Sequence, residues 1–431
     1  MSATLTTLPP STLSNTTSGD LGRSPLPQAH SGTNSLDTDK QRLQLAPVLC
    51  HLITNLEVVT DSQDRIVALV NNITTSLLTP LFHSKAFPSS INPSALEILL
   101  HISKKAPTAK TWKKDVLDAF SDPRFLQSPF HLIKESWLPV LRQWCFHDRE
   151  RMPELISRLT PPSTAGIMFG VGANAARLEA DRKTQSALRR ACILLLSTPA
   201  DVHAAHMPHF EEKLAELLTA TASSSPSSAI KSELLMLCRA LTLSINAVHL
   251  APLWPIINDT LQSALSSLLP QTVKKDSSFT NLSLLQACKL LDLLIGLSPE
   301  EFQLHEWLYI TDTIDAVYQP TQYQPPALAD YVSGELGVAN LDDSVAVLTP
   351  PMPTSEAAST SKAPLSSNIA VDARDAKVMA KEDFARLVLR PFLSQLSIHA
   401  YESVYNLEAL DVEASRDDLL RDVLDLSTMV E

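Results

Sequence analysis

Three histidines at regular spacing are the feature of this sequence that most resembles a metal site. His203, His206 and His209 follow one another at intervals of three residues, and two histidines three apart on a helix can share a face. Pro208 interrupts the third position, and no Cys, Asp or Glu completes a set at the spacing that zinc sites use. We therefore expect no metal site here, and keep a metal-dependent hydrolase built on His203 as an unfavoured alternative.

A pair of carboxylates could in principle support general acid–base catalysis. Asp312 and Asp315 lie three residues apart on a predicted helix, but such catalysis needs a cleft and two well-separated pKa values. The chain contains 9 glycines in 431 residues, which is too few for phosphate loops or dinucleotide turns. It also lacks the Gly-x-Ser-x-Gly, His-Glu-x-x-His and Gly-Lys-Ser motifs. We expect no enzyme, no cofactor, and no catalytic or metal-binding residues.

The charge of the chain opposes sequence-independent binding to nucleic acid, since 35 Lys and Arg face 47 Asp and Glu. Any anionic partner must therefore meet a local basic patch. One candidate could contact an anionic membrane surface, with an indole at headgroup depth, although an ordinary solvated helix surface is the alternative. This patch comprises Lys104, Lys105, Lys110, Trp112, Lys113 and Lys114. A second basic set, expected on one solvated helix face, comprises Arg182, Lys183, Arg189 and Arg190.

Helices must position these side chains. From about Lys40 to Tyr318, apolar residues recur three and four apart, which is the amphipathic helix pattern. Four cysteines fall at intervals of 47, 46 and 50 residues, namely Cys145, Cys192, Cys238 and Cys288. This pitch is typical of helical-hairpin repeats, in which each cysteine is a small buried side chain. We predict an all-α, HEAT- or armadillo-like solenoid, with an irregular helical bundle as the alternative.

Composition divides the chain into four parts. Residues 1–38 contain 19 Ser, Thr or Pro and are predicted to be a disordered tail. Residues 39–318 form the helical-repeat domain, residues 319–372 a disordered acidic linker, and residues 373–431 the C-terminal helices, which cap the array or pair with a partner chain. The lack of an apolar run of about 20 residues predicts a cytoplasmic chain with at most peripheral membrane contact.

Several long blocks resemble one known family. They run from His249 to Ile257, from Gln286 to Leu294 and from Phe302 to Tyr318. Together with weaker blocks on either side, they make residues 130–410 similar to the C-terminal region of Dopey proteins. The residues that carry the resemblance are expected to be structural: Leu253, Trp254, Pro255, Cys288, Lys289, Asp292, Trp307, Asp312 and Asp315.

The Dopey resemblance implies a non-catalytic scaffold in Golgi–endosome membrane traffic and protein transport. Such a protein is peripheral on Golgi, trans-Golgi network and endosomal membranes. The resemblance implies a large Golgi scaffold related to Arf exchange factors and a phospholipid flippase as partners, with links in animals to kinesin light chain and phosphatidylinositol 4-phosphate. Dopey chains are several times longer than this one. A soluble solenoid adaptor without organelle attachment is the alternative function.

Overall fold

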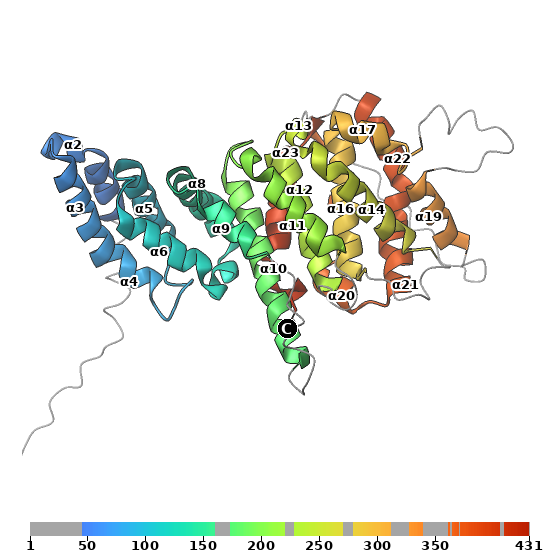
Figure 1. Ribbon diagram of the computed structural model, residues 1–431, viewed down its shortest axis with the longest axis horizontal. Helices are drawn as coiled ribbons and strands as arrows, with labels where there is room; N and C mark the ends of the chain where they lie inside the picture. The colour runs from blue at the N-terminus through green and yellow to red at the C-terminus, as the bar shows by residue number, and fades with distance from the viewer. Residues whose placement is uncertain are drawn as a thin grey trace, which may run out of the picture. The chain divides into compact units, whose positions relative to one another are not determined.

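Apolar residues three and four apart give each segment of this chain one face to bury, and the resulting helices stack. The computed structural model describes residues 45–159, 173–219, 228–269, 279–311, 327–338, 361–362, 364–369, 371–405 and 409–430. Within residues 46–431, which form one unit, the fold is an all-α solenoid, as predicted (Figure 1). The predicted tail of residues 1–38 lies outside the described residues.

The first group of elements lies within residues 45–159, and η in their labels denotes a 3₁₀ or π turn. They are the helix Leu45–Thr54, α2 (Leu56–Val59), α3 (Gln63–Ile73), η1 (Thr74–Leu78), α4 (Thr79–Phe82), α5 (Pro93–Lys105), α6 (Lys110–Ser121), η2 (Pro123–Gln127), α7 (Phe130–Leu132), η3 (Ile133–Trp137), α8 (Leu138–His147) and α9 (Arg151–Ser157).

The remaining elements complete the array and return along it. They are α10 (Ala173–Ser197), η5 (Ala204–His206), α11 (Met207–Thr219), α12 (Ser228–Ser244), α13 (Ala247–Leu250), η6 (Ala251–Leu253), α14 (Trp254–Ser266), α16 (Asn281–Leu297), α17 (Glu300–Glu306), α19 (Leu328–Val338), β1 (Ser361–Lys362), η7 (Leu365–Asn368), α20 (Ala373–Val378), α21 (Lys381–Phe384), η8 (Ala385–Leu389), α22 (Arg390–Tyr405), β2 (Ala409–Leu410), α23 (Val412–Leu424) and η9 (Leu426–Thr428). The two strands are two residues long and pair in parallel.

The cysteine spacing does mark the repeat. Cys145, Cys192, Cys238 and Cys288 are buried and unpaired, and lie one each in α8, α10, α12 and α16. These four helices contact one another in that order. A second layer holds α9, α11 and α14, which also contact one another in order and pack on the first layer. The cysteines therefore occupy corresponding positions in successive hairpins, as predicted.

Prolines inside three long helices are each accommodated by a π turn. A proline lacks the N–H that the carbonyl four residues earlier needs, and its ring clashes with that carbonyl. In all three cases the π turn ends two residues before the proline: η1 before Pro80, η3 before Pro139 and η8 before Pro391. The wider turn lets each helix continue past the proline. At Pro391 the π turn η8 leads directly into α22, so the helical segment is continuous.

Helix α19 corrects the linker prediction. Residues 328–338 fall inside the segment 319–372 that composition assigns to a disordered linker, but they form a helix against α14 and α22. Ala329 and Val332 are fully buried, and Asp330 accepts hydrogen bonds from Thr311 (2.6 Å) and Ser397 (2.9 Å). An apolar stripe is sufficient for a helix to form in a proline-rich segment when neighbouring helices cover that stripe. Much of the rest of that segment lies outside the described residues.

The C-terminal helices pack on the solenoid. α22 contacts α16 and α19, α20 contacts α16, and α23 contacts α7, α10 and α12. Of the helices in the described ranges, none is on its own both long and apolar enough to cross a bilayer. α16 and α17 reach that length and composition only as a pair, with a bend of 115° between them.

Candidate interaction surfaces

The predicted lysine patch lies on α5 and α6, but its residues differ in their exposure and in whether they already have a partner within the chain. Lys104, Lys110 and Lys114 are exposed. Lys105 forms an ion pair with Glu57 (2.7 Å). Lys113 donates a hydrogen bond to the backbone carbonyl of His147 (3.1 Å), where it completes the C-terminus of α8. Three exposed lysines therefore remain as candidates for contact with an anion.

Trp112 does not belong to that surface. Its side chain is 0% exposed, and its indole Nε1–H donates to the carbonyl of Ala106 (3.1 Å). The indole fills the space between α5 and α6, where its apolar area stabilises the hairpin and its single donor is satisfied. The prediction that Trp112 reaches headgroup depth is wrong, because the helix face that carries it faces the core.

The three histidines do not converge on a metal site. His203 is buried in the turn before η5, while His206 and His209 are progressively more exposed. The His203 and His206 ring centroids are 6.1 Å apart. Burial and the neighbouring His206 lower the pKa of His203 from 6.5 to about 4. His203 is therefore a buried, neutral, structural residue at the end of a helical hairpin, and its protonation at low pH is expected to lower the stability of the fold.

The basic face predicted on α10 is also not simply solvated. Arg182 and Lys183 are exposed, but Arg189 is fully buried. Arg190 donates to the carbonyls of Phe120 (2.7 Å) and Asp122 (3.1 Å) at the end of α6. Arg189 contacts α12 and the end of α23, whereas Arg190 contacts the end of α6, so the four basic residues do not share one solvated face.

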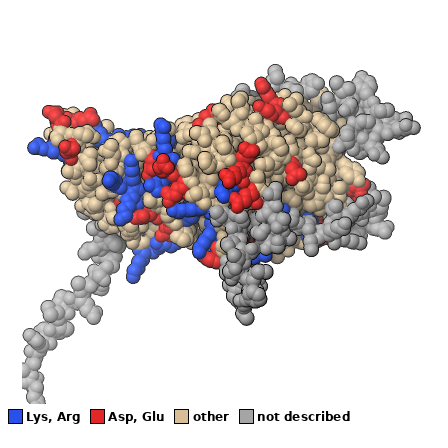
Figure 2. Space-filling model, in the orientation of Figure 1, with Lys and Arg blue, Asp and Glu red and all other residues tan. Residues whose placement is uncertain are grey.

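A cleft of about 890 Å³ lies next to Arg182 and Lys183, between α6, α9 and α10. Five basic side chains line it: Arg151, Arg158, Arg182, Lys183 and Arg190. Its two carboxylates are both ion-paired, Glu154 with Arg151 and Arg158 and Glu179 with Lys183 (3.4 Å). These charges suit the binding of an anion better than general acid–base catalysis. Figure 2 shows charged side chains gathered over the α2–α11 part, whereas the surface over α14, α16 and α22 is mostly uncharged.

Residues of the family resemblance in α16 tie the C-terminal helices to the array. Cys288 and Asp292 are buried. Asp292 accepts a hydrogen bond from the backbone N–H of Ser366 (2.8 Å) and faces His399 (3.9 Å). Lys289 forms ion pairs with Asp418 (3.1 Å) and Asp422 (2.9 Å) of α23. All three therefore have structural contacts within the chain.

A buried ionic network, which the sequence analysis did not predict, holds α23 against the array. Arg239 of α12 donates to Asp418 (2.6 Å), to Asp422 (2.6 Å) and to Gln286 (2.7 Å). Burial alone would raise the pKa of Asp422, but Lys289 and Arg239 hold it below its ordinary value. One signal was available: Arg239 and Lys289 each directly follow a repeat cysteine in an otherwise apolar helix segment.

A second buried pair lies one repeat earlier. Arg189 of α10 and Glu233 of α12 are 0% and 1% exposed at their side chains, with Arg189 Nη2 and Glu233 Oε1 2.8 Å apart. Arg189 also donates to the carbonyls of Val423 (2.9 Å) and Asp425 (2.8 Å). It thereby caps the C-terminal end of α23. Together the two networks hold α23 against α10, α12 and α16.

The other residues of the resemblance lie around α13, α14 and α17. Leu253 and Trp254 are buried, Pro255 is exposed, and the Trp254 ring packs near that of Phe302 (centroids 6.3 Å apart). Trp307, for which a core position was expected, is instead exposed. Asp312 and Asp315 lie outside the described residues.

Exposed apolar side chains recur in the three short segments that follow α10, α12 and α16. Each directly precedes a histidine: Val202 before His203, Val248 before His249, and Leu304 before His305. Their exposed fractions are 36%, 71% and 72%, and Trp307 is 62% exposed. We call Val202, Val248, Leu304 and Trp307 the apolar edge. Trp307 Nε1–H donates to the Leu304 carbonyl (3.1 Å), which holds the indole beside that residue.

The turns of the apolar edge are neighbours. The N–H of Asp201 donates to the carbonyl of Ser244 (3.0 Å), and the Asp201 carboxylate accepts from the N–H of Asn246 (2.7 Å). The segments that follow α10 and α12 are therefore in direct contact. α14 contacts α17, and α13 and α17 lie at the same end of the unit (Figure 1). Large exposed apolar side chains in a row mark interaction surfaces.

Comparisons with known proteins identify the family. The family model described as "DOP1 C-terminal" matches residues 7–406. The chain is 46% identical over 404 residues to "Protein dop1" of Emericella nidulans, covering 92% of this chain and 21% of that protein. It is 24% identical over 371 residues to "Protein DOP1" of Saccharomyces cerevisiae, covering 84% of this chain and 20% of that protein. It is 24% identical over 296 residues to "Protein DOP1B" of Xenopus laevis, covering 62% and 12%.

No solved structure matches the chain. The chain spans about a fifth of the length of the first two of these relatives. The family model covers most of the chain, and the repeat helices and α20–α22 fall within it, whereas α23 lies beyond its end. This protein belongs to the Dopey (DOP1) family and corresponds to its C-terminal region.

Proposed function

We propose that this chain is a non-catalytic scaffold module in Golgi–endosome membrane traffic, and that it acts through protein contacts made by the apolar edge. The observation that carries the proposal is the recurrence of exposed apolar residues in the three segments that follow α10, α12 and α16, with an exposed tryptophan in the last of them. Tryptophan is enriched among the residues that dominate binding energy at interfaces. Family membership and the all-helical fold support a role without catalysis.

The charges around the apolar edge indicate the chemistry of its partner. Residues 198–207, 245–256 and 298–308 contain no Lys or Arg, and their charged side chains are Asp201, Glu300, Glu301 and Glu306. Arg142 and Arg416 donate to backbone carbonyls at the ends of α10 and α12, so the acidic part of the edge is the α17 end, which carries Leu304 and Trp307. This end is complementary to a helix with an apolar stripe flanked by Lys or Arg. It is a poor match for an anionic membrane. The large Golgi scaffold related to Arf exchange factors is our proposed partner, with a phospholipid flippase as a further one.

Binding to that scaffold tests the proposal. Purified chain would be titrated by biolayer interferometry with helical segments of the scaffold. We expect Trp307→Ala to weaken binding by about 30-fold or more, because loss of an interface hot spot removes at least about 2 kcal/mol. The side chain is mostly solvent-exposed, so the variant should keep the thermal stability of the wild type.

The matched control is Val378→Ala. Val378 is 80% exposed, but it ends α20, which packs near Asn281 at the opposite end of α16 from α17. Binding should survive this change. If Trp307→Ala and Val378→Ala bind alike, the apolar edge is not the docking surface. If no scaffold segment binds the wild type, the proposed partner is wrong.

Peripheral attachment to Golgi and endosomal membranes is the second part of the proposal, and the exposed lysines support it. Lys104, Lys110 and Lys114 have no ion pair with any described residue, and each lysine near an anionic bilayer contributes about 1 kcal/mol. We expect reversal of all three to Glu to lower binding to liposomes containing phosphatidylinositol 4-phosphate by at least about 100-fold. Flotation would measure it.

A charge-matched control changes Arg65, Arg374 and Arg390 to Glu; these arginines are exposed and lie outside both the lysine patch and the cleft beside α10. This control should float like the wild type. Equal losses in the two triple variants would mean that net charge, and not the lysine patch, governs membrane contact. Absence of flotation for the wild type would favour a soluble solenoid adaptor.

A further inference from the structure

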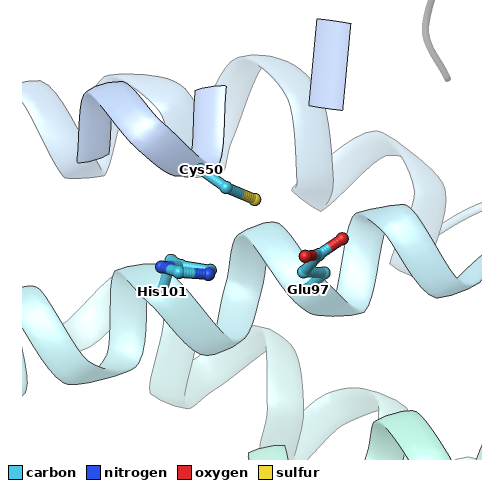
Figure 3. Close-up of side chains that lie close together, drawn as sticks. All are labelled: Cys50, Glu97 and His101. Atoms are coloured by element: carbon cyan, nitrogen blue, oxygen red, sulfur yellow. The ribbon is translucent and has the colours of Figure 1, made fainter. Parts of the chain in front are cut away.

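Three side chains with metal-binding atoms converge at the N-terminal end of the described array. Cys50 lies on the helix Leu45–Thr54, and Glu97 and His101 lie one turn apart on α5. Their sulfur, oxygen and nitrogen atoms are all within 4.8 Å of one another. Figure 3 shows the sulfur directed across to α5, where the carboxylate and the imidazole flank the same space. In the parts of the chain that the structure describes, no other group of this kind occurs.

The three side chains differ in exposure. The Cys50 sulfur is buried, His101 is half-buried and Glu97 is exposed at the surface. Glu97 forms no ion pair with any described residue. Its carboxylate is therefore available as a ligand from the solvent side, and a bound metal ion would favour the thiolate form of the buried cysteine.

A hydrogen bond fixes the imidazole in a tautomer that can bind metal. The Thr54 hydroxyl donates its one proton to the carbonyl of Cys50 (2.8 Å). Its oxygen also lies 2.9 Å from His101 Nδ1. Since the hydroxyl proton is already used, the proton of this second bond belongs to Nδ1, and Nε2 keeps its lone pair. Metal-binding histidines typically donate their other ring N–H to such a neighbour.

We propose that Cys50, Glu97 and His101 bind one zinc ion, with solvent as the fourth ligand. A thiolate, an imidazole and a carboxylate together are a ligand set that zinc accepts, whereas magnesium and calcium prefer oxygen alone. Tetrahedral zinc places its ligand atoms roughly 3.4 Å apart. Side-chain rotations that move each ligand atom by about 1 Å would therefore bring the three atoms to zinc-binding distances. On binding, the thiol proton passes to solvent and sulfur forms the bond to zinc.

The ion would join the first described helix to α5. A nearby ion pair between Glu57 of α2 and Lys105 of α5 links neighbouring turns of these segments. Metal binding to the folded chain raises its stability. Zinc therefore stabilises this end of the array independently of the apolar edge, which lies in the turns that follow α10, α12 and α16.

Metal content and spectroscopy test the site on the complete chain. Wild-type protein titrated with zinc against a chelating dye is expected to bind one equivalent, and cobalt is expected to give a thiolate-to-cobalt charge-transfer band. Cys50→Ser should abolish that band, and Glu97→Gln or His101→Asn should weaken zinc binding by more than about 10-fold. Thr54→Val keeps all three ligands but removes the partner of Nδ1, so we expect a loss of about 10- to 100-fold.

His51→Asn is the matched control. His51 is an exposed histidine next to Cys50 that contacts Asn55, and its replacement should leave zinc and cobalt binding unchanged. Zinc should also raise the melting temperature of the wild type and of His51→Asn, but not of Cys50→Ser. The proposal is overturned if the wild type binds no stoichiometric zinc, or if Cys50→Ser retains the charge-transfer band.

Discussion

Replacing Arg189 by Met is expected to lower the free energy of unfolding by about 3–5 kcal/mol, because it leaves a buried carboxylate without its counter-charge. Glu233 would keep a single long hydrogen bond from Gln185 (3.3 Å). The carbonyls of Val423 and Asp425 would also lose a charged donor. Urea unfolding followed by circular dichroism would measure the change.

Two further variants separate this effect from a general loss of side-chain packing. Arg182→Met alters an exposed arginine of the same helix and should change stability by less than about 0.5 kcal/mol. The double variant Arg189→Met with Glu233→Leu removes both buried charges and should recover much of the loss. If Arg189→Met is no worse than Arg182→Met, the buried pair does not matter for stability.

Acidification is expected to destabilise the protein through His203. Its pKa falls from 6.5 to about 4 on folding, so the unfolded chain takes up the proton at a higher pH than the folded chain does. Stability from this residue is therefore complete above pH 6.5 and is lost as the pH falls toward 4. A shift of that size corresponds to about 3 kcal/mol.

The pH effect is measured as a difference between variants, since many carboxylates also titrate in acid. Urea midpoints from pH 7 to pH 4 would be compared for the wild type and His203→Leu, and the wild type should lose more stability over this range. His249→Asn, at an exposed histidine in the next turn, should follow the wild type. Parallel curves for the wild type and His203→Leu would contradict the prediction.

The repeat could be predicted because the intervals between the cysteines in the sequence match the length of one helical hairpin. A hairpin of fixed length places one small buried residue per repeat, and the cysteine intervals report that length directly. Some helix starts carry a local signal of the same kind in the structure: Asn92 caps α5 and Thr280 caps α16 with side-chain oxygens. These are local signals that need no knowledge of what packs against what.

The surfaces could not be predicted, because the same amphipathic pattern serves a core and an interface. Trp112 among lysines looked exposed and is buried, whereas Trp307 in an apolar block looked buried and is exposed. The difference lies in which helix covers each face. Likewise, Arg189 and Arg239 are buried because α23 returns over them from far along the chain. Periodicity within one helix carries no information about that return.

The ion pairs that hold α23 against α12 and α16 also have a consequence for folding during synthesis. Arg239 and its partner Asp422 are 183 residues apart in sequence. A ribosome adding about 5–20 residues per second needs roughly 10–40 s to cover that distance. For this interval Arg239 has neither Asp418 nor Asp422 as a partner. An array that could otherwise assemble hairpin by hairpin therefore completes this ion-pair network only after α23 has been synthesised.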